Sequence, residues 1–308
     1  MDQKLAFLCS GQGDQYPGMG QELVRAYPAA AAVYERCDAI RPATSRQCFF
    51  GTEEELKETR NTQPCLFAFE LAAAEVLFGK GVIPAAVAGF SLGEVAAATI
   101  SGLFEMETGF RLVCRRGELM QQAAEQYETR MAVVLRLSKE QVEACCARYS
   151  DLYPVNYNCP GQITVSGLAA QMEDFLREVR TMGGRAVPLK VGGAFHSPFM
   201  KEASEEFASS LARVKMTERS IPLYSNRTAE RYPDKTDPGY LDRVIKLLSG
   251  QIASPVLWEN LIRQMIADGI RTFVELGPGR TLTNMMKKID TDVKAYSLTD
   301  YLTEVEGC

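Results

Sequence analysis

The sequence has almost no histidine: His196 is the single imidazole among 308 residues. A metal site built on several histidines is therefore excluded, and a reaction that needs an imidazole base has one candidate. Cysteine is more frequent, with nine residues, but no Cys-x-x-Cys pair occurs, and Cys145 and Cys146 are adjacent, a spacing poorly suited to chelating one zinc ion. An odd number of cysteines without a secretory leader favours free thiols in a reducing compartment. We therefore expect no metal.

Long apolar runs and an excess of positive charge are also missing. No apolar segment reaches the roughly 18 residues that a membrane-spanning helix needs, and the first residues do not resemble a signal peptide. The chain has 34 basic and 39 acidic residues, a formal net charge of −5. A nucleic-acid-binding protein is expected to carry a basic excess or stripe instead. We therefore expect a cytoplasmic protein that binds neither membranes nor nucleic acid.

The sequence does contain enough apolar material for a sizeable core, with 46% hydrophobic residues over a length greater than that of a usual single domain. Short apolar runs at 5–9 and 85–89 are typical of buried parallel strands. Helical patterns cover 21–27, 29–38, 63–79, 93–101 and 107–126, with Pro64 placed in the first turn of the third. Short strands at 221–224, 272–276 and 294–297 alternate with further helical patterns. This alternation predicts an α/β fold with a parallel sheet flanked by helices.

The pattern changes near residue 130, where strands and helices follow in the order β-α-β-β-α-β. The expected strands are 131–137, 153–158, 162–166 and 185–189. The expected helices are one that opens at 138 and ends at 149 and a second over 169–181. The first of these helices opens with a capping-box pattern at Ser138 and Gln141. This order is that of the split ferredoxin-like unit. We therefore predict a hydrolase-like parallel-sheet domain of residues 1–128 and 195–308, interrupted by a ferredoxin-like subdomain of residues 129–194.

The strongest local signal for chemistry is the Gly-x-Ser-x-Gly segment at residues 89–93, between a predicted strand and a predicted helix. A serine on such a sharp turn needs flanking glycines, because neighbouring side chains would clash. The turn presents Ser91 Oγ at a helix N-terminus, where the Leu92 N–H can point at a developing oxyanion. The alternative is a chance match in a surface loop, but the strand-turn-helix context favours a nucleophile.

A serine hydroxyl is a weak nucleophile that needs a base within hydrogen-bond reach. His196 follows two glycines in a loop at the predicted junction of the two domains, where clefts form. The alternative is a histidine with only a structural role. A second glycine-rich loop at 11–15 can bring a backbone N–H close to a substrate oxygen, but Tyr16 stands where a dinucleotide-binding fingerprint requires glycine.

Together, these residues and several other short motifs resemble the malonyl-CoA:acyl carrier protein transacylases and the acyltransferase domains of fatty-acid and polyketide synthases. The resemblance covers nearly the whole chain, and its motifs occur in the family's order. The matching segments are residues 11–15, 62–64, 89–94, 116–121, 156–162, 193–197, 251–258 and 275–279. Any one of these motifs is weak, whereas eight in sequence order argue against coincidence.

The resemblance implies a ping-pong transfer of malonyl from malonyl-CoA to the phosphopantetheine thiol of an acyl carrier protein. Ser91 would carry the malonyl ester and His196 would be its base. The backbone N–H groups of Gln12 and Leu92 would form the oxyanion hole. Arg116 would hold the free carboxylate of malonate through a bidentate pair, although its position alone would also suit a surface arginine on a helix.

The family also implies roles for three further residues and no cofactor beyond the two substrates. Gln251 would orient the histidine through its backbone carbonyl, in place of the usual carboxylate. Gln63 and Asn158 would line the substrate pocket. The main departure from the family is Phe90, which stands where the family has a histidine that is not the base. This difference leaves the polarity of the pocket wall, and hence the choice of acyl group, open.

Three alternatives remain open from the sequence. A separate acyltransferase of a polyketide synthase would use the same residues on another extender unit. A serine thioesterase or other hydrolase would deliver the acyl group to water, although a His-Gly-Gly-Gly oxyanion segment cannot occur because the single histidine precedes Ser197. A non-catalytic module that docks a carrier protein would not need Ser91, Arg116 and His196 to be intact.

Overall fold

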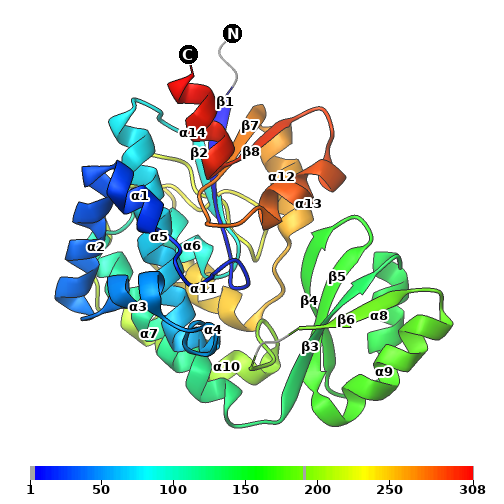
Figure 1. Ribbon diagram of the computed structural model, residues 1–308. Helices are drawn as coiled ribbons and strands as arrows, with labels where there is room; N and C mark the ends of the chain where they lie inside the picture. The colour runs from blue at the N-terminus through cyan, green and yellow to red at the C-terminus, as the bar shows by residue number, and fades with distance from the viewer. Residues whose placement is uncertain (1–3, 190–191, 308) are drawn as a thin grey trace.

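The computed structural model describes residues 4–189 and 192–307. It contains two four-stranded sheets, one parallel and one antiparallel. The antiparallel sheet, with its two helices, forms the green subdomain on the right of Figure 1, and the parallel sheet lies inside the larger part. The predicted α/β architecture is therefore confirmed.

The parallel sheet is formed by strands from both ends of the chain. Its order is β2 (Ala86–Gly89), β1 (Lys4–Cys9), β7 (Ile270–Glu275) and β8 (Lys294–Ser297). In β1, Phe7 belongs to one hydrophobic core, and its neighbour Leu8 belongs to a second core on the opposite face. Both faces of the sheet are thus covered, which explains why its first strands appear in the sequence as continuous apolar runs.

Helices cover both faces of this sheet. The core on the Phe7 side includes residues of three helices, one before β2 in the chain and two after it. These are α5 (Thr59–Gly79), α6 (Gly93–Ile100) and α7 (Met106–Ala124). The core on the Leu8 side includes residues of α12 (Trp258–Ala267) and α13 (Thr281–Ile289). The remaining helices of the larger part are α1 (Gln21–Ala26), α2 (Pro28–Ile40), α3 (Thr44–Phe50), α4 (Glu53–Lys57), α10 (Lys201–Leu211), α11 (Tyr240–Gly250) and α14 (Leu298–Glu306). Within the described residues, no helix has both the length and the apolar character needed to cross a membrane.

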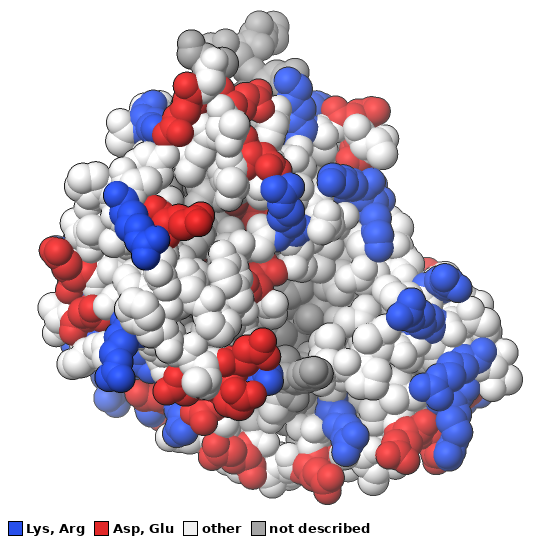
Figure 2. Space-filling view, in the orientation of Figure 1, with Lys and Arg blue, Asp and Glu red and all other residues white. Residues whose placement is uncertain are grey.

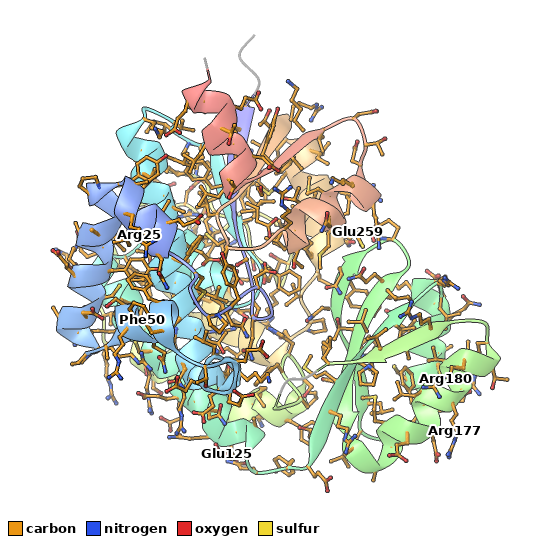
Figure 3. All side chains as sticks on the ribbon, in the orientation of Figure 1. Arg25, Phe50, Glu125, Arg177, Arg180 and Glu259 are labelled. Carbon is orange, nitrogen blue, oxygen red and sulfur yellow. The ribbon has the colours of Figure 1, made fainter. Side chains whose placement is uncertain are left out.

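The antiparallel sheet has the strand order β4 (Leu152–Cys159), β5 (Gln162–Leu168), β3 (Thr129–Leu135) and β6 (Arg185–Pro188). With α8 (Lys139–Cys146) and α9 (Ala169–Thr181), this is the arrangement of a ferredoxin-like unit. In Figure 3, the labelled Arg177 and Arg180 extend from α9 at the outer side of this subdomain. Its elements all lie within the predicted insertion, whose limits of 129 and 194 remain a prediction.

A backbone connection joins the two parts at the outer edge of β4. The Val256 N–H donates to the Val155 carbonyl at 2.8 Å, and the Tyr157 N–H donates to the Val256 carbonyl at 2.9 Å. Val256 also forms an isolated parallel bridge with Asn156. The segment before α12 therefore covers an edge that would otherwise offer unpaired backbone groups.

Two predicted elements differ from the structure. Helix α5 begins at Thr59, so Pro64 lies inside the helix and not at its start. The proline removes only the hydrogen bond to the carbonyl four residues earlier, and the helix has no side-chain cap that would have revealed its true start. The predicted strand at 221–224 is reduced to isolated bridges of Leu223 with Val87 and of Tyr224 with Arg231. Pro222 has no N–H to extend the pairing with β2.

Candidate active site

Ser91 lies on the sharp turn between β2 and α6, as predicted. Its φ is 54°, in the left-handed region that non-glycine residues seldom adopt. A Cβ on Gly89 would overlap the Gly93 carbonyl, and a Cβ on Gly93 would lie 2.5 Å from the Cys9 carbonyl oxygen. The two glycines therefore allow the strand, the turn and the helix to pack closely enough to project the serine side chain.

The Ser91 hydroxyl contacts the single histidine. His196 Nε2 lies 2.7 Å from Ser91 Oγ, and His196 Nδ1 lies 2.8 Å from the backbone carbonyl of Gln251. Because a carbonyl oxygen can only accept, Nδ1 must carry the hydrogen, which leaves the Nε2 lone pair facing the serine. The backbone carbonyl of Gln251 thus selects the tautomer that a general base requires.

Burial keeps His196 neutral. The side chain is only 3% exposed, and burial together with the nearby Arg116 cation lowers the pKa of His196 to about 4. Both causes act against the charged imidazolium. At neutral pH the imidazole is therefore unprotonated and able to accept the serine proton.

Arg116 is a fully buried cation beside the serine. One guanidinium nitrogen donates to Gln63 Oε1 at 2.8 Å, and the other donates to Gln251 Oε1 at 3.1 Å and to Ser91 Oγ at 3.3 Å. The third nitrogen, Nε, has no partner among the described residues. Burial lowers the pKa of Arg116 to about 9, so the group stays charged at neutral pH. Its acceptors are all neutral, which leaves the positive charge available to an anion.

The backbone N–H groups of Gln12 and Leu92 are the expected oxyanion hole. Both residues line the same cavity as Ser91. Within residues 4–189 and 192–307, neither N–H donates to a protein acceptor. The loop that carries Gln12 is held by its side chain, whose Oε1 accepts from Thr59 Oγ1 at 2.7 Å, and Thr59 Oγ1 in turn accepts from Gln63 Nε2 at 3.1 Å.

The cavity around these groups is small, about 70 Å³, and lies between the parallel-sheet part and the antiparallel subdomain. Figure 2 shows that this face of the molecule is indented between the two parts, with basic and acidic side chains interspersed around it. The cavity has a polar side, which includes Ser91, Arg116 and His196, and an apolar wall. The apolar wall is formed by Phe90, Met120, Met131, Leu189 and Phe195. Such a space suits a short acyl group with one polar end.

Phe90 replaces the family's histidine with an aromatic wall. Its ring packs edge-on against Trp258, with centroids 5.4 Å apart. It also lies so close to Gly11 that a Cβ there would be 2.7 Å from the ring. The ring therefore lies against the loop that carries Gln12, and it offers no hydrogen bond to a ligand.

The structure brings together seven of the eight predicted site residues, but it does not bring Asn158 to the cavity. The Asn158 amide donates to Thr164 Oγ1 at 3.2 Å, inside the antiparallel sheet. Asn156, two residues earlier on β4, lines the cavity instead, and its Oδ1 has no partner among the described residues. Alternation along a strand puts both asparagines on one face, so the pattern alone did not separate them.

Sequence reasoning missed two buried residues beside the nucleophile. Asn226 accepts the Ser91 N–H on its Oδ1 at 2.7 Å, and Glu94 accepts the Asn226 N–H at 3.2 Å. Burial raises the pKa of Glu94 to about 8. Glu94 belongs to a motif already noted, but nothing in the sequence pairs it with Asn226, which lies in a loop far along the chain.

Comparisons with known proteins agree with this geometry. The sequence profile of the acyl transferase domain family matches residues 6–300. The malonyl CoA-acyl carrier protein transacylase of Bacillus subtilis is 34% identical over 303 residues, covering 96% of this chain and 94% of that protein. The crystal structure of a malonyl-CoA:acyl carrier protein transacylase from Xanthomonas oryzae superposes with a TM-score of 0.94 at 30% identity, covering 100% of this chain and 99% of that one.

A third similar structure contains a partner. It is a malonyl-transacylase in complex with the acyl-carrier protein of a type II polyketide synthase, with a TM-score of 0.93 and 28% identity. The match covers 99% of this chain and 100% of that transacylase chain. The similarity therefore extends over both parts of the fold.

Proposed function

The chain belongs to the acyl transferase domain family, and we propose that it transfers a malonyl group from malonyl-CoA to the phosphopantetheine thiol of an acyl carrier protein. The Bacillus subtilis relative and the Xanthomonas oryzae structure are malonyl transacylases, and the third similar structure is a malonyl-transacylase in complex with an acyl-carrier protein. The substrates are malonyl-CoA and the carrier protein, and no further cofactor takes part in the scheme.

In the first half-reaction, Ser91 becomes acylated. Ser91 Oγ attacks the thioester carbonyl of malonyl-CoA while its proton passes to His196 Nε2. The negative charge that develops on the carbonyl oxygen is stabilised by the N–H groups of Gln12 and Leu92. The carbon–sulfur bond then breaks, and His196 returns the proton to the departing CoA sulfur.

In the second half-reaction, the carrier protein takes the place of CoA. The thiol proton of its phosphopantetheine passes to His196 Nε2 as the sulfur attacks the Ser91 ester. The ester bond breaks, and His196 returns the proton to Ser91 Oγ. The Nδ1–H bond to the Gln251 carbonyl stabilises the imidazolium that forms transiently in both halves.

Arg116 supplies the selectivity for a malonyl group. The free carboxylate of malonate would lose its water in this cavity, which is costly unless the charge is paired. The guanidinium offers two parallel donors that match a carboxylate, and Gln63 and Gln251 hold it in place. An acyl group without a charge gains nothing from this contact.

The observation that carries the proposal is the double contact at Ser91 Oγ, with His196 Nε2 at 2.7 Å and an Arg116 nitrogen at 3.3 Å. A base beside a serine is common to serine hydrolases and acyltransferases. A buried, uncompensated guanidinium beside that serine favours a substrate whose acyl group carries its own carboxylate.

The test is to mix the purified protein with malonyl-, methylmalonyl- and acetyl-CoA and to record the intact mass of the protein. We expect a malonyl adduct that disappears when phosphopantetheinylated carrier protein is added and appears on that protein. Carrier protein without phosphopantetheine is the matched control. Ser91→Ala should form no adduct, and His196→Ala should form it about 10² to 10⁴ times more slowly. Release of free malonate to water, with none on the carrier protein, would identify a hydrolase instead.

A further inference from the structure

The backbone of Ser91 is held from both sides by buried amide side chains. Asn226 Oδ1 accepts the Ser91 N–H at 2.7 Å, and Gln251 Nε2 donates to the Ser91 carbonyl at 2.9 Å. A serine in the left-handed region persists only where the surrounding structure holds it. Gln251 also contacts His196 and Arg116, whereas the hydrogen bonds of the Asn226 side chain to the described residues go only to the turn.

The Asn226 amide spans the turn that carries the nucleophile. Its Nδ2 donates to the Gly89 carbonyl at 2.5 Å, while its Oδ1 accepts from the Ser91 N–H. One planar group therefore fixes the backbone two residues apart, on either side of Phe90. Asn226 is fully buried, so no solvent molecule competes for either hydrogen bond.

Asn226 is in turn fixed by the helix that begins after the turn. Its N–H donates to Glu94 Oε1 at 3.2 Å, and Tyr232 Oη donates to the same oxygen at 2.7 Å. Its carbonyl accepts from the Leu257 N–H at 2.8 Å. Because Glu94 lies in the first turn of α6, the strand, the serine, the helix and Asn226 form one closed ring of contacts.

We propose that Asn226 is a positioning residue for acylation, acting through the Ser91 backbone. It holds the turn so that Ser91 Oγ stays 2.7 Å from His196 Nε2 and the Leu92 N–H stays aimed into the cavity. The inference rests on the proposed function, because it takes Ser91 as the nucleophile. A small displacement of a reacting group is sufficient to slow a reaction by about two orders of magnitude.

The first test is Asn226→Ala, which removes both hydrogen bonds to the turn. We expect the single-turnover rate of malonyl-enzyme formation at saturating malonyl-CoA to fall about 10- to 100-fold. The half-saturating concentration of malonyl-CoA should stay unchanged, since Asn226 is not among the residues that line the cavity. The yield of adduct at long times should remain complete.

A second variant, Asn226→Asp, keeps the size and shape of the side chain and so protects the test against a failure to fold. An ionised carboxylate has no hydrogen to donate to the Gly89 carbonyl, whereas a protonated one has both a donor and an acceptor. The acylation rate of this variant, divided by that of the wild type at each pH, should therefore rise from pH 8 to pH 5. The Asn226→Ala ratio should not change with pH.

Tyr224→Phe is the matched control. It removes a buried hydroxyl only two residues before Asn226, and that hydroxyl contacts Asp268 and Arg231, away from the turn. We expect lower thermal stability with the wild-type rate of acylation. If Asn226→Ala behaves in the same way, or if only its half-saturating concentration rises, Asn226 has no positioning role. A malonyl adduct on Ser91→Ala would instead overturn the proposed function, so the two failures are distinguishable.

Discussion

Arg116 shows how a buried charge can be kept without an acidic partner. Its hydrogen bonds go to two side-chain amides and one hydroxyl, and no carboxylate of the described residues comes within ion-pair distance. An unpaired buried cation costs stability, and a substrate carboxylate that paired with it would offset that cost. The sequence resemblance suggested that Arg116 binds the malonate carboxylate, and its burial supports this proposal.

We therefore predict that Arg116→Ala separates charged from uncharged acyl groups. Acylation by malonyl-CoA should fall by about 30-fold to several thousandfold, corresponding to roughly 2–5 kcal/mol for a buried charge left unmatched. Acylation by acetyl-CoA should not fall, because its acyl group has no charge to match. Arg116→Lys should recover part of the malonyl rate, since an ammonium lacks the two parallel donors.

Arg115→Ala provides the control for this comparison. Arg115 lies next to Arg116 on α7, but its side chain is exposed and pairs with Glu118 and Glu206. Its loss should change neither rate. Equal losses of malonyl and acetyl acylation in Arg116→Ala would assign Arg116 a structural role.

The environment of His196 predicts an unusual pH dependence for acylation. Only the neutral imidazole accepts the Ser91 proton, and its pKa is lowered to about 4 by burial and by Arg116. The acylation rate should therefore be constant between pH 5 and 8 and fall about tenfold per pH unit below pH 4. Quenched-flow measurements of the malonyl adduct in this range test the prediction. A decrease centred near pH 6.5 would contradict the buried environment of the imidazole.

At the scale of single elements, a capping signal alone did not determine which helices could be predicted. The Ser138 and Gln141 capping box is present as expected at the start of α8. The same pattern occurs at Thr52 and Glu55, where it opens α4, a helix that we did not predict. Helix α4 has only five residues, so its capping box was not supported by a recognisable hydrophobic periodicity.

The Ser138 cap has a measurable contribution to stability. Its Oγ accepts the Gln141 N–H at 3.3 Å, and Gln141 Oε1 accepts the Ser138 N–H at 2.8 Å. We predict that Ser138→Ala lowers the free energy of unfolding by about 1 kcal/mol. Urea denaturation tests this value, with Ser209→Ala on the exposed side of α10 as a control that should change it by less than about 0.5 kcal/mol. The malonyl acylation rate should be the same in both variants, because α8 lies outside the cavity.

At the scale of the whole molecule, local patterns identified the elements but not all the contacts among them. The motif around Ser91 and the single histidine were visible in the sequence, as was the two-sheet architecture. The contact of Asn226 with Ser91 joins residues 135 positions apart and leaves no periodic pattern in either segment. Asn156 and Asn158 would share a face in a regular strand, but the register of β4 against β5 shifts between Pro154 and Asn156 and again between Tyr157 and Cys159, which simple alternation does not encode.

Buried acids should make the stability of the whole protein depend on pH. Burial raises the pKa of Glu94 to about 8 and that of Asp14 to about 7. Above about pH 5 the unfolded chain has released these protons and the folded chain has not, so raising the pH favours unfolding. We predict that the free energy of unfolding falls between pH 5 and 7 by roughly 1.4 kcal/mol per pH unit for each group.

Variants of one carboxyl each test this slope. Glu94→Gln should reduce the slope of the free energy of unfolding against pH by the contribution of about one proton, because the amide does not titrate. Glu107→Gln should leave it unchanged between pH 5 and 8, since Arg36 lowers the pKa of Glu107 and that group loses its proton only in acid. His196 acts in the opposite sense: its pKa is below the usual value when folded, so stability is lost as the pH falls from about 6.5 towards 4. A free energy of unfolding that did not vary from pH 4 to 8 would contradict both the raised pKa values of the buried acids and the lowered pKa of His196.

The backbone connection between β4 and Val256 also sets an order of events during synthesis of the chain. Strand β4 ends at Cys159, but the segment that covers its edge leaves the ribosome roughly 100 residues later. At about 5–20 residues per second, this delay is on the order of 5–20 s. For that time the nascent subdomain has an open sheet edge, which is the feature that recruits other unfinished strands. A ribosome pause before residue 256 would lengthen the time during which the open edge can pair with another chain.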